Sequence, residues 1–193
     1  PSLRQNREIV LAAVAQNGRA LEWAADELKN DHEVVLTAVS SRPQALLWAS
    51  DLLRSNPEIV FTAVRSDGHV LRCVGEELRS NYEIVFAAVS RHGSALQYAA
   101  EELRHNRQLV WKAVSDYGLA LEWAAEELRS DGETVLAAVE QDVFALCLAA
   151  DVLLEDHSFA VEARQHFHFF KIVTLSGRSC IVALSLYDST ESL

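Results

Sequence analysis

The chain has 193 residues, of which 50% are hydrophobic, and its formal net charge is −11 at pH 7. This length and apolar content suffice for a continuous buried core, and no apolar run reaches the roughly 20 residues that a membrane-spanning helix needs. The negative charge argues against nucleic acid as a partner, because binding to a phosphate backbone depends on Lys and Arg.

An Asn or Asp recurs along the chain at a spacing of 25 residues. The positions are Asn6, Asp31, Asn56, Asn81, Asn106, Asp131 and Asp156. From this period we predict an array over residues 1–165, with six full repeats that start near residues 6, 31, 56, 81, 106 and 131 and a half repeat from residue 156.

The first part of each repeat has the pattern of a short amphipathic helix. In the first copy Ile9, Val10, Ala13 and Val14 are apolar, and their spacings mark one face of a helix. The Asn or Asp stands where an N-cap belongs, since its side-chain oxygen can accept from the free N–H groups of the first turn. A Gly at positions 18, 68, 93 and 118 predicts that this helix ends in a residue with positive φ.

A second helix is predicted after this Gly. Its inward face in the first copy is Ala20, Leu21, Ala24 and Leu28, again at helical spacings. Helices of about ten residues are marginal alone in water, so the helix-turn-helix units must stack and share a core. The predicted fold class is therefore mainly α, a right-handed-type α-solenoid of short helix-turn-helix repeats.

One column of the second helix is rich in aromatic residues. Its members are Trp23, Trp48, Cys73, Tyr98, Trp123 and Leu148. A core column is the favoured interpretation, because protein interiors are densely filled, and an aromatic binding groove is the alternative. Pro43 and Val143 replace the Gly in two units. Because Pro cannot take the left-handed conformation, we expect a rearranged turn and altered curvature there, with Pro43 opening the second helix.

The run from Asn81 to Arg104, NYEIVFAAVSRHGSALQYAAEELR, resembles the tandem helical repeat of the domain of unknown function 4116. Several columns match at once over six copies, and the resemblance covers residues 6–163. It implies a helical repeat unit. The family brings no assigned activity and no catalytic residues that could be carried over to this chain.

The negative charge belongs to the array. The chain has 28 acidic and 17 basic residues; two of each lie after Gln165, which leaves 26 and 15 in residues 1–165. Much of the acidity recurs at Glu76, Glu101 and Glu126, each three residues before an Arg. A solvated face with weak surface pairs is the favoured interpretation, and an acidic ladder that attracts a basic protein partner or loosely held cations is the alternative.

Solenoids bind through surface positions that vary between repeats, and here the variable columns lie around the turn and the start of the second helix. The candidate partner-binding residues in them are Arg42, His69, Arg72, His92 and Tyr117. Different chemistry at equivalent places suits an irregular partner surface, and drift without selection is an equal alternative.

The 25-residue period stops after Gln165, and residues 166–193 are predicted to form a β-hairpin. Apolar runs over 170–175 and 180–186 bracket Ser176-Gly177-Arg178, a turn sequence. This segment resembles the opening of a ubiquitin-like domain that is cut short at Leu193. The resemblance implies that Leu175 matches a turn leucine of the partner-binding surface in ubiquitin.

No catalytic constellation is visible from spacing, and no cofactor is predicted. His166, His168 and Cys180 could meet across the hairpin as metal ligands, but a polar linker beside a buried Cys is the favoured interpretation. The three cysteines, Cys73, Cys147 and Cys180, match neither a disulfide framework nor a metal knuckle. This pattern favours a reducing, intracellular and cytoplasmic setting.

The chain begins at Pro1 and contains no Met, so we expect it to be a segment of a longer protein, which leaves open a targeting segment upstream. The predicted function is a non-catalytic scaffold for protein–protein interaction, with the ubiquitin-like module recruiting a second partner. A structural subunit or spacer in a large assembly is one alternative. An accessory region of a longer multidomain enzyme is the other.

Overall fold

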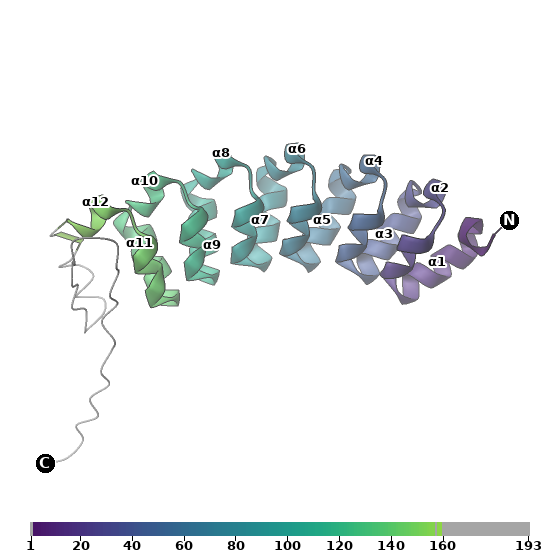
Figure 1. Cartoon of the computed structure of the whole chain (residues 1–193), viewed down its shortest axis with the longest axis horizontal. Helices are drawn as coiled ribbons and strands as arrows, with labels where there is room; N and C mark the ends of the chain where they lie inside the picture. Colours follow the sequence, from purple (N-terminus) through teal and green to yellow (C-terminus); the bar gives the residue numbers. More distant parts are fainter. Residues whose placement is uncertain (1, 157, 160–193) are drawn as a thin grey trace, which may run out of the picture.

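The structure of the chain, a computed structural model, describes residues 2–156, 158 and 159 as an elongated row of stacked units (Figure 1). Each unit has three elements in the same order: an α-helix of ten residues, a 3-10 helix of six residues and an α-helix of four residues. A short 3-10 helix, η1 (Leu3–Gln5), precedes the first unit. The prediction of a mainly helical array of repeated units is confirmed.

The long helices lie side by side and form one layer of the array. They are α1 (Arg7–Gln16), α3 (His32–Ser41), α5 (Pro57–Ser66), α7 (Tyr82–Arg91), α9 (Arg107–Asp116) and α11 (Gly132–Gln141). The 3-10 helices that follow them are η2 (Gly18–Trp23), η3 (Pro43–Trp48), η4 (Gly68–Cys73), η5 (Gly93–Tyr98), η6 (Gly118–Trp123) and η7 (Val143–Leu148).

The short helices form a ridge along the upper edge of the array in Figure 1. They are α2 (Asp26–Lys29), α4 (Asp51–Arg54), α6 (Glu76–Arg79), α8 (Glu101–Arg104), α10 (Glu126–Arg129) and α12 (Asp151–Leu154). We call this edge the ridge, and we call the opposite edge, where each long helix passes into its 3-10 helix, the turn edge.

The predicted N-caps are confirmed in all six units. Asn6 accepts from the N–H groups of Glu8 and Ile9, over 3.1 and 3.2 Å, and the Asn or Asp of each later unit accepts from the equivalent N–H group. Because the first N–H groups of a helix have no partner inside it, these bonds fix where each long helix begins.

We expected the second helix of each unit to be one continuous α-helix. It is instead divided into two helices. In the first unit the 3-10 helix ends at Trp23, Ala24 and Ala25 are extended, and only then does the short α-helix begin. The extended Ala25 N–H donates to the Arg4 carbonyl over 2.9 Å. The same backbone bond joins Ser50 to Lys29, Ala100 to Arg79, Ala125 to Arg104 and Ala150 to Arg129.

The periodic glycines do not provide a positive φ, which corrects the prediction for Gly18, Gly68, Gly93 and Gly118; no glycine in the described residues has a left-handed φ. The residue that ends each long helix is extended, as at Asn17 with φ −149°. Each of these glycines instead lies against the next unit. A Cβ at Gly118 would overlap the Ala138 carbonyl oxygen and lie 3.0 Å from the Asp142 nitrogen.

The core runs continuously through the row. Every long helix packs against the next long helix, and the 3-10 helix between them packs against both. One Leu per 3-10 helix is fully buried in the first five units: Leu21, Leu46, Leu71, Leu96 and Leu121. The buried side chains therefore belong to interfaces between units, so a single unit has no core of its own.

The aromatic column is core only in part. Trp48, Tyr98, Trp123 and Leu148 are partly buried and pack against the core, as predicted. Trp23 is 57% exposed, and the Arg4 guanidinium lies 5.7 Å from the centre of its ring. Its unit stands at the N-terminal end of the described array.

The turn at Pro43 is not rearranged, although the proline opens η3 as predicted. Arg42, which precedes it, has φ −149° and ψ 107°, and Asn17 at the equivalent place has φ −149° and ψ 103°. The expected turn conformation was wrong because no unit uses a left-handed residue there. Proline therefore meets no conformational conflict.

The predicted β-hairpin, its ubiquitin-like resemblance, Leu175 and the group His166, His168 and Cys180 lie outside the described residues. Within the described part of the chain, no helix is both long enough and apolar enough to cross a bilayer.

Candidate functional site

The structure separates the predicted partner-binding residues into two groups on opposite edges. Arg42, His92 and Tyr117 each end a long helix at the turn edge, and His69 lies beside them in η4. Glu76, Glu101 and Glu126 each begin a short helix on the ridge. Arg72, near the end of η4, faces the ridge side, where it lines a hollow.

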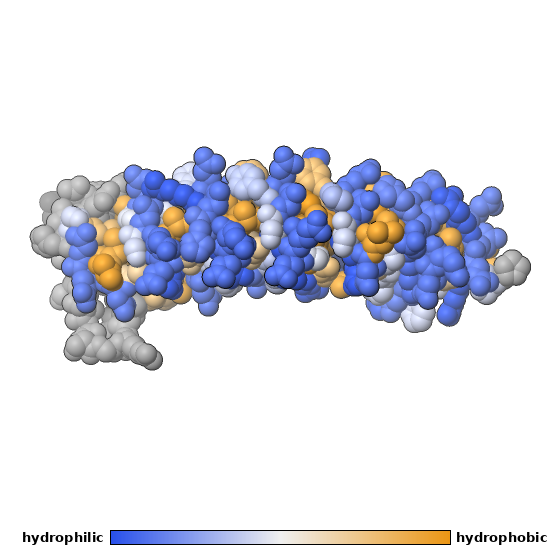
Figure 2. All heavy atoms as spheres, turned by 90° about the horizontal axis from the view of Figure 1, so that it is seen from above, coloured by the Kyte–Doolittle hydropathy of each residue, from blue (hydrophilic) through white to orange (hydrophobic). Residues whose placement is uncertain are grey.

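The ridge is hydrophilic, with narrower hydrophobic strips between the units (Figure 2). The first residue of each short helix is acidic, so acidic side chains form a row along the ridge, as the acidic-ladder interpretation requires. Surface pairs three residues apart form in the first two units, where Lys29 lies 3.5 Å from Asp26 and Arg54 pairs with Asp51. The predicted pairs of Glu76, Glu101 and Glu126 with the Arg three residues later do not form in the described structure. Pairs of this kind, exposed on a surface, stabilise a fold only slightly.

In two later units the Arg of the ridge has a different role. Arg104 donates to the Ala99 carbonyl over 3.0 Å and to the Gln97 carbonyl over 2.8 Å, and Arg79 donates to the Val74 carbonyl over 2.9 Å. These carbonyls lie in or just after the 3-10 helix of the same unit. The guanidinium groups therefore hold the divided second helix together, and Glu76 and Glu101 project as an exposed row.

Hollows between successive units of the ridge include two that are lined entirely by described residues. The larger one, about 720 Å³, is lined by Arg54, Arg72, Cys73, Gly75 and Arg79 among others. The smaller one, about 540 Å³, lies between α8 and α10 and is lined by Glu101, Trp123 and Glu126 among others. The two hollows thus differ in charge, although the units that form them are equivalent.

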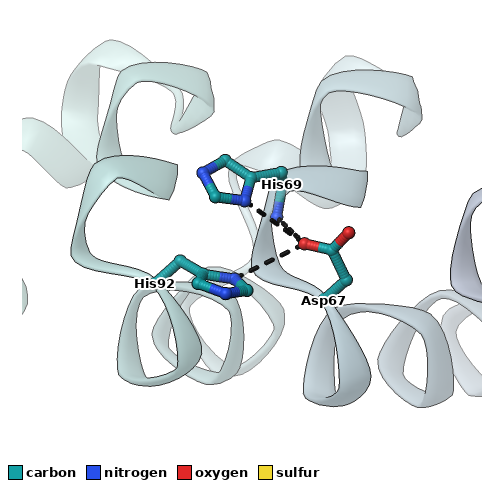
Figure 3. A group of neighbouring side chains, drawn as sticks. All are labelled: Asp67, His69 and His92. Carbon is teal, nitrogen blue, oxygen red and sulfur yellow. Dashed lines mark hydrogen bonds and ion pairs between the residues drawn. The ribbon is translucent and has the colours of Figure 1, made fainter.

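The turn edge gathers a polar cluster between the third and fourth units (Figure 3). Asp67 ends α5, His69 is the second residue of η4, and His92 ends α7 at the place equivalent to Asp67. Asp67 Oδ1 lies 3.3 Å from His69 Nδ1 and 3.4 Å from His92 Nδ1. The two imidazole rings have centroids 4.5 Å apart.

Neighbouring groups hold the carboxylate and the rings of this cluster. Asp67 Oδ1 accepts from the His69 backbone N–H over 3.0 Å, and Asp67 Oδ2 accepts from Gln44 Nε2 over 2.5 Å. Although partial burial raises the pKa of Asp67, these hydrogen bonds hold that pKa below its ordinary value. Asp67 is therefore ionised at neutral pH.

Ser94, His69 and Asp67 also form a chain of hydrogen-bonding distances. Ser94 Oγ lies 2.9 Å from His69 Nε2, on the side of the ring away from Asp67. This order resembles the chemistry of a nucleophile, a base and an orienting carboxylate. The two hollows described above both lie on the opposite edge, so neither places a substrate beside Ser94.

A second surface was not foreseen from the sequence. Five residues after the N-cap, Phe61, Phe86 and Trp111 are exposed on three consecutive long helices, α5, α7 and α9. Tyr82 stacks on Phe86 with ring centroids 5.6 Å apart. We call Phe61, Tyr82, Phe86 and Trp111 the aromatic row. The signal in the sequence was a column of large apolar residues, but their exposure depends on how far neighbouring units cover them.

Comparison with known proteins covers most of the chain. The family described as "Domain of unknown function (DUF4116)" matches it in three stretches, residues 2–54, 56–104 and 106–154. Each stretch spans two of the 25-residue units. No curated protein and no solved structure matches the chain.

Proposed function

The chain belongs to the family of the domain of unknown function (DUF4116), and from that premise we propose that it is a non-catalytic scaffold whose aromatic row binds a basic segment of another protein. The observation that carries the proposal is the exposure of aromatic side chains at equivalent places on three adjacent helices. A partner that extends along the array would meet one such side chain per unit.

Exposed aromatic side chains in a row are informative because soluble proteins bury such groups. Trp111 is 51% exposed, and Phe61 and Phe86 are also exposed, whereas the Val that directly precedes each of them is fully buried. We take these side chains as one apolar surface, and exposed apolar patches are typical of interaction sites. Trp, Tyr and Phe are also the residues enriched at the centres of protein interfaces.

Acidic residues in the first turns of α5 and α7, and the net charge of the chain, favour a basic partner. Glu58 and Glu83 lie in the first turns of α5 and α7, three residues before Phe61 and Phe86, and both are exposed. The chain as a whole carries a net charge of −11. Complementary charge raises association rates and selects against acidic partners, and Lys or Arg can also lie over the aromatic faces.

The test is a selection of random-sequence peptides against the purified chain, followed by measurement of Kd for the enriched peptides. We expect these peptides to contain Lys or Arg together with large apolar residues. Phe86→Ala and Trp111→Ala should each weaken binding by about 5-fold or more, which is about 1 kcal/mol. Leu52→Ala is the matched control, because Leu52 is an exposed apolar residue on the ridge.

Unchanged Kd in both aromatic variants, or loss of binding in Leu52→Ala as well, would contradict the proposal. Circular dichroism of each variant establishes that its helices are intact. Enrichment of acidic peptides would contradict the charge argument while leaving the aromatic row in place.

A further inference from the structure

The turn edge carries three side chains, Asp67, His69 and His92, that peptide binding by the aromatic row does not use. We propose that Asp67, His69 and His92 form a binding site for one zinc ion, with a fourth coordination position open to water. This inference goes beyond the scaffold function, because the cluster lies on a different surface from the aromatic row. Imidazole and carboxylate groups are ligands that zinc takes in proteins.

The spacing of the ligand atoms suits a tetrahedral ion. With zinc bonds of about 2.0–2.1 Å, two ligand atoms of a tetrahedral site lie about 3.3–3.4 Å apart. Asp67 Oδ1 is 3.3 Å from His69 Nδ1 and 3.4 Å from His92 Nδ1. One ligand atom from each of the three residues lies within 4.8 Å of the other two. The carboxylate oxygen therefore has ligand spacing to both rings.

A zinc ion would take one lone pair from each of the three ligand residues. Asp67 is ionised, and His92 Nδ1 is unprotonated because it accepts from the Gly68 N–H over 3.1 Å, so a zinc ion at this nitrogen would replace that N–H as its partner. When His69 Nε2 donates to Ser94 Oγ, over 2.9 Å, His69 Nδ1 also presents a lone pair to the carboxylate. Metal-ligating histidines commonly donate their second N–H in this way.

Contacts from the second and the fourth units hold Asp67 and His69 in place. Gln44 of the second unit binds Asp67 Oδ2, which turns Oδ1 toward the two rings. Ser94 of the fourth unit binds the far side of His69. All three ligands keep part of their surface in solvent, with side-chain exposures of 21% for Asp67, 43% for His69 and 37% for His92, so water can reach the fourth position.

The other junctions of the array serve as internal comparisons. At the positions equivalent to Asp67, His69 and His92, the preceding junction has Arg42, Gln44 and Asp67, and the following one has His92, Ser94 and Tyr117. Within the described residues, only the junction between the third and fourth units brings three metal-ligating side chains together. The site is thus a property of one junction rather than of the repeat.

The test titrates zinc chloride into the full chain at neutral pH in competition with a chromogenic chelator. We expect one zinc ion per chain, bound about 10-fold or more weakly after His69→Ala or His92→Ala. His105→Ala is the matched control, because His105 is also exposed and near a carboxylate, Glu127, but lies outside the cluster. A second readout is cobalt(II) in place of zinc, whose visible absorption reports tetrahedral coordination.

Absence of stoichiometric zinc binding would overturn the proposal. Undiminished binding in both His69→Ala and His92→Ala would also overturn it, since zinc would then be held by other groups of the chain. Because both rings are partly exposed, these variants should keep the fold, which circular dichroism verifies. The peptide measurements on the aromatic row are independent of this result.

Discussion

At the scale of single residues, the N-cap column shows how local capping and contacts between units are combined. Arg7, the first residue of α1, pairs with the next N-cap, Asp31, over 2.8 Å and with Glu33 over 2.5 Å. Arg107 makes the same pair of contacts with Asp131 and Glu133. Where the first helical residue is His32, Pro57 or Tyr82, the next N-cap is Asn. Both Arg residues therefore have an Asp one unit later, although Asp156 also follows a helix that begins with Gly132.

The pair at Asp31 predicts a pH dependence of stability. The hydrogen bond from Arg7 lowers the pKa of Asp31 below its unfolded value of about 3.9. Because the folded pKa is the lower one, the stabilisation is present above the unfolded pKa and is lost as the pH falls through the folded pKa. Asp31→Asn keeps an N-cap but not the charge, so its deficit in unfolding free energy should be largest at neutral pH and disappear in acid.

Urea denaturation of the wild-type chain and of Asp31→Asn, between about pH 5 and pH 2, measures this difference. Asp26→Asn is the control, because Asp26 is an almost fully exposed carboxylate in a ridge pair. A deficit in Asp31→Asn that does not change with pH would contradict the assignment.

Two glycines allow a matched test of close packing. Gly118→Ala should destabilise the array by about 1–3 kcal/mol, because the new Cβ overlaps the Ala138 carbonyl and the backbone must shift. Gly75→Ala should be neutral or stabilise by up to about 1 kcal/mol, because the nearest atom, Ser55 Oγ, is 3.6 Å from the new Cβ. The other units have Ala or Ser at the place of Gly75. Thermal unfolding measures the stability of both variants, and equal effects of Gly118→Ala and Gly75→Ala would contradict the close packing assigned to Gly118.

At the scale of elements, the first helix of each unit could be predicted from the sequence and the second could not. The N-caps and the apolar face determine the long helices locally, so Asn6 and Val14 sufficed for α1. The division of the second helix has no local signal, because Ala24 and Ala25 favour helix and carry no turn chemistry. In most units a bond to the preceding unit accompanies the extended pair, as from the Ala100 N–H to the Arg79 carbonyl, and Val74 and Gly75 are extended without it. Contacts between units cannot be deduced from a single period.

The hydrogen bonds of Arg104 allow a prediction of how much the link across a divided second helix stabilises the array. Arg104→Ala should destabilise the array by about 1–2 kcal/mol, because two carbonyls of the η5 segment lose a charged donor. Arg104→Lys should recover little of this loss, since an ammonium group cannot donate in the fork geometry of a guanidinium. Glu101→Gln should leave unfolding unchanged in chemical denaturation. A large loss of unfolding free energy in Glu101→Gln would show that a surface pair of Glu101 with Arg104, rather than the bonds from Arg104 to the carbonyls, stabilises this unit.

At the scale of the whole molecule, the sequence predicted the stacking and the variable turn edge but not which side chains meet there. Asp67 and His92 occupy the same column in consecutive units, so the 25-residue period predicts that they lie near each other. The approach of His69 to both depends on the 3-10 geometry of η4, which was expected to be α-helical. The aromatic row was missed for a similar reason: Phe86 and the buried Val85 are adjacent in sequence, and only the packing of the units decides which is covered.

The continuous core predicts that the position of a substitution determines how the array unfolds. Leu96→Ala and Leu21→Ala each empty a fully buried site, at a cost of about 2–5 kcal/mol. Because each unit is stabilised only by its neighbours, Leu96→Ala in the middle should divide the unfolding transition into two steps. Leu21→Ala at the end should leave one main transition. Chemical denaturation followed by circular dichroism and by Trp fluorescence distinguishes the two, and identical single transitions would contradict this expectation.

The backbone bonds along the ridge have a mechanical consequence. Among the described residues, five junctions are joined by such a bond, as between Ala25 and Arg4, and the bond is not found between Gly75 and Arg54, where the larger hollow opens. An elongated array bends most easily at the junction between units that lacks such a bond. We therefore expect bending of the array to concentrate between α4 and α6, which would let two comparatively stiff arms adjust their angle to fit the shape of a bound protein.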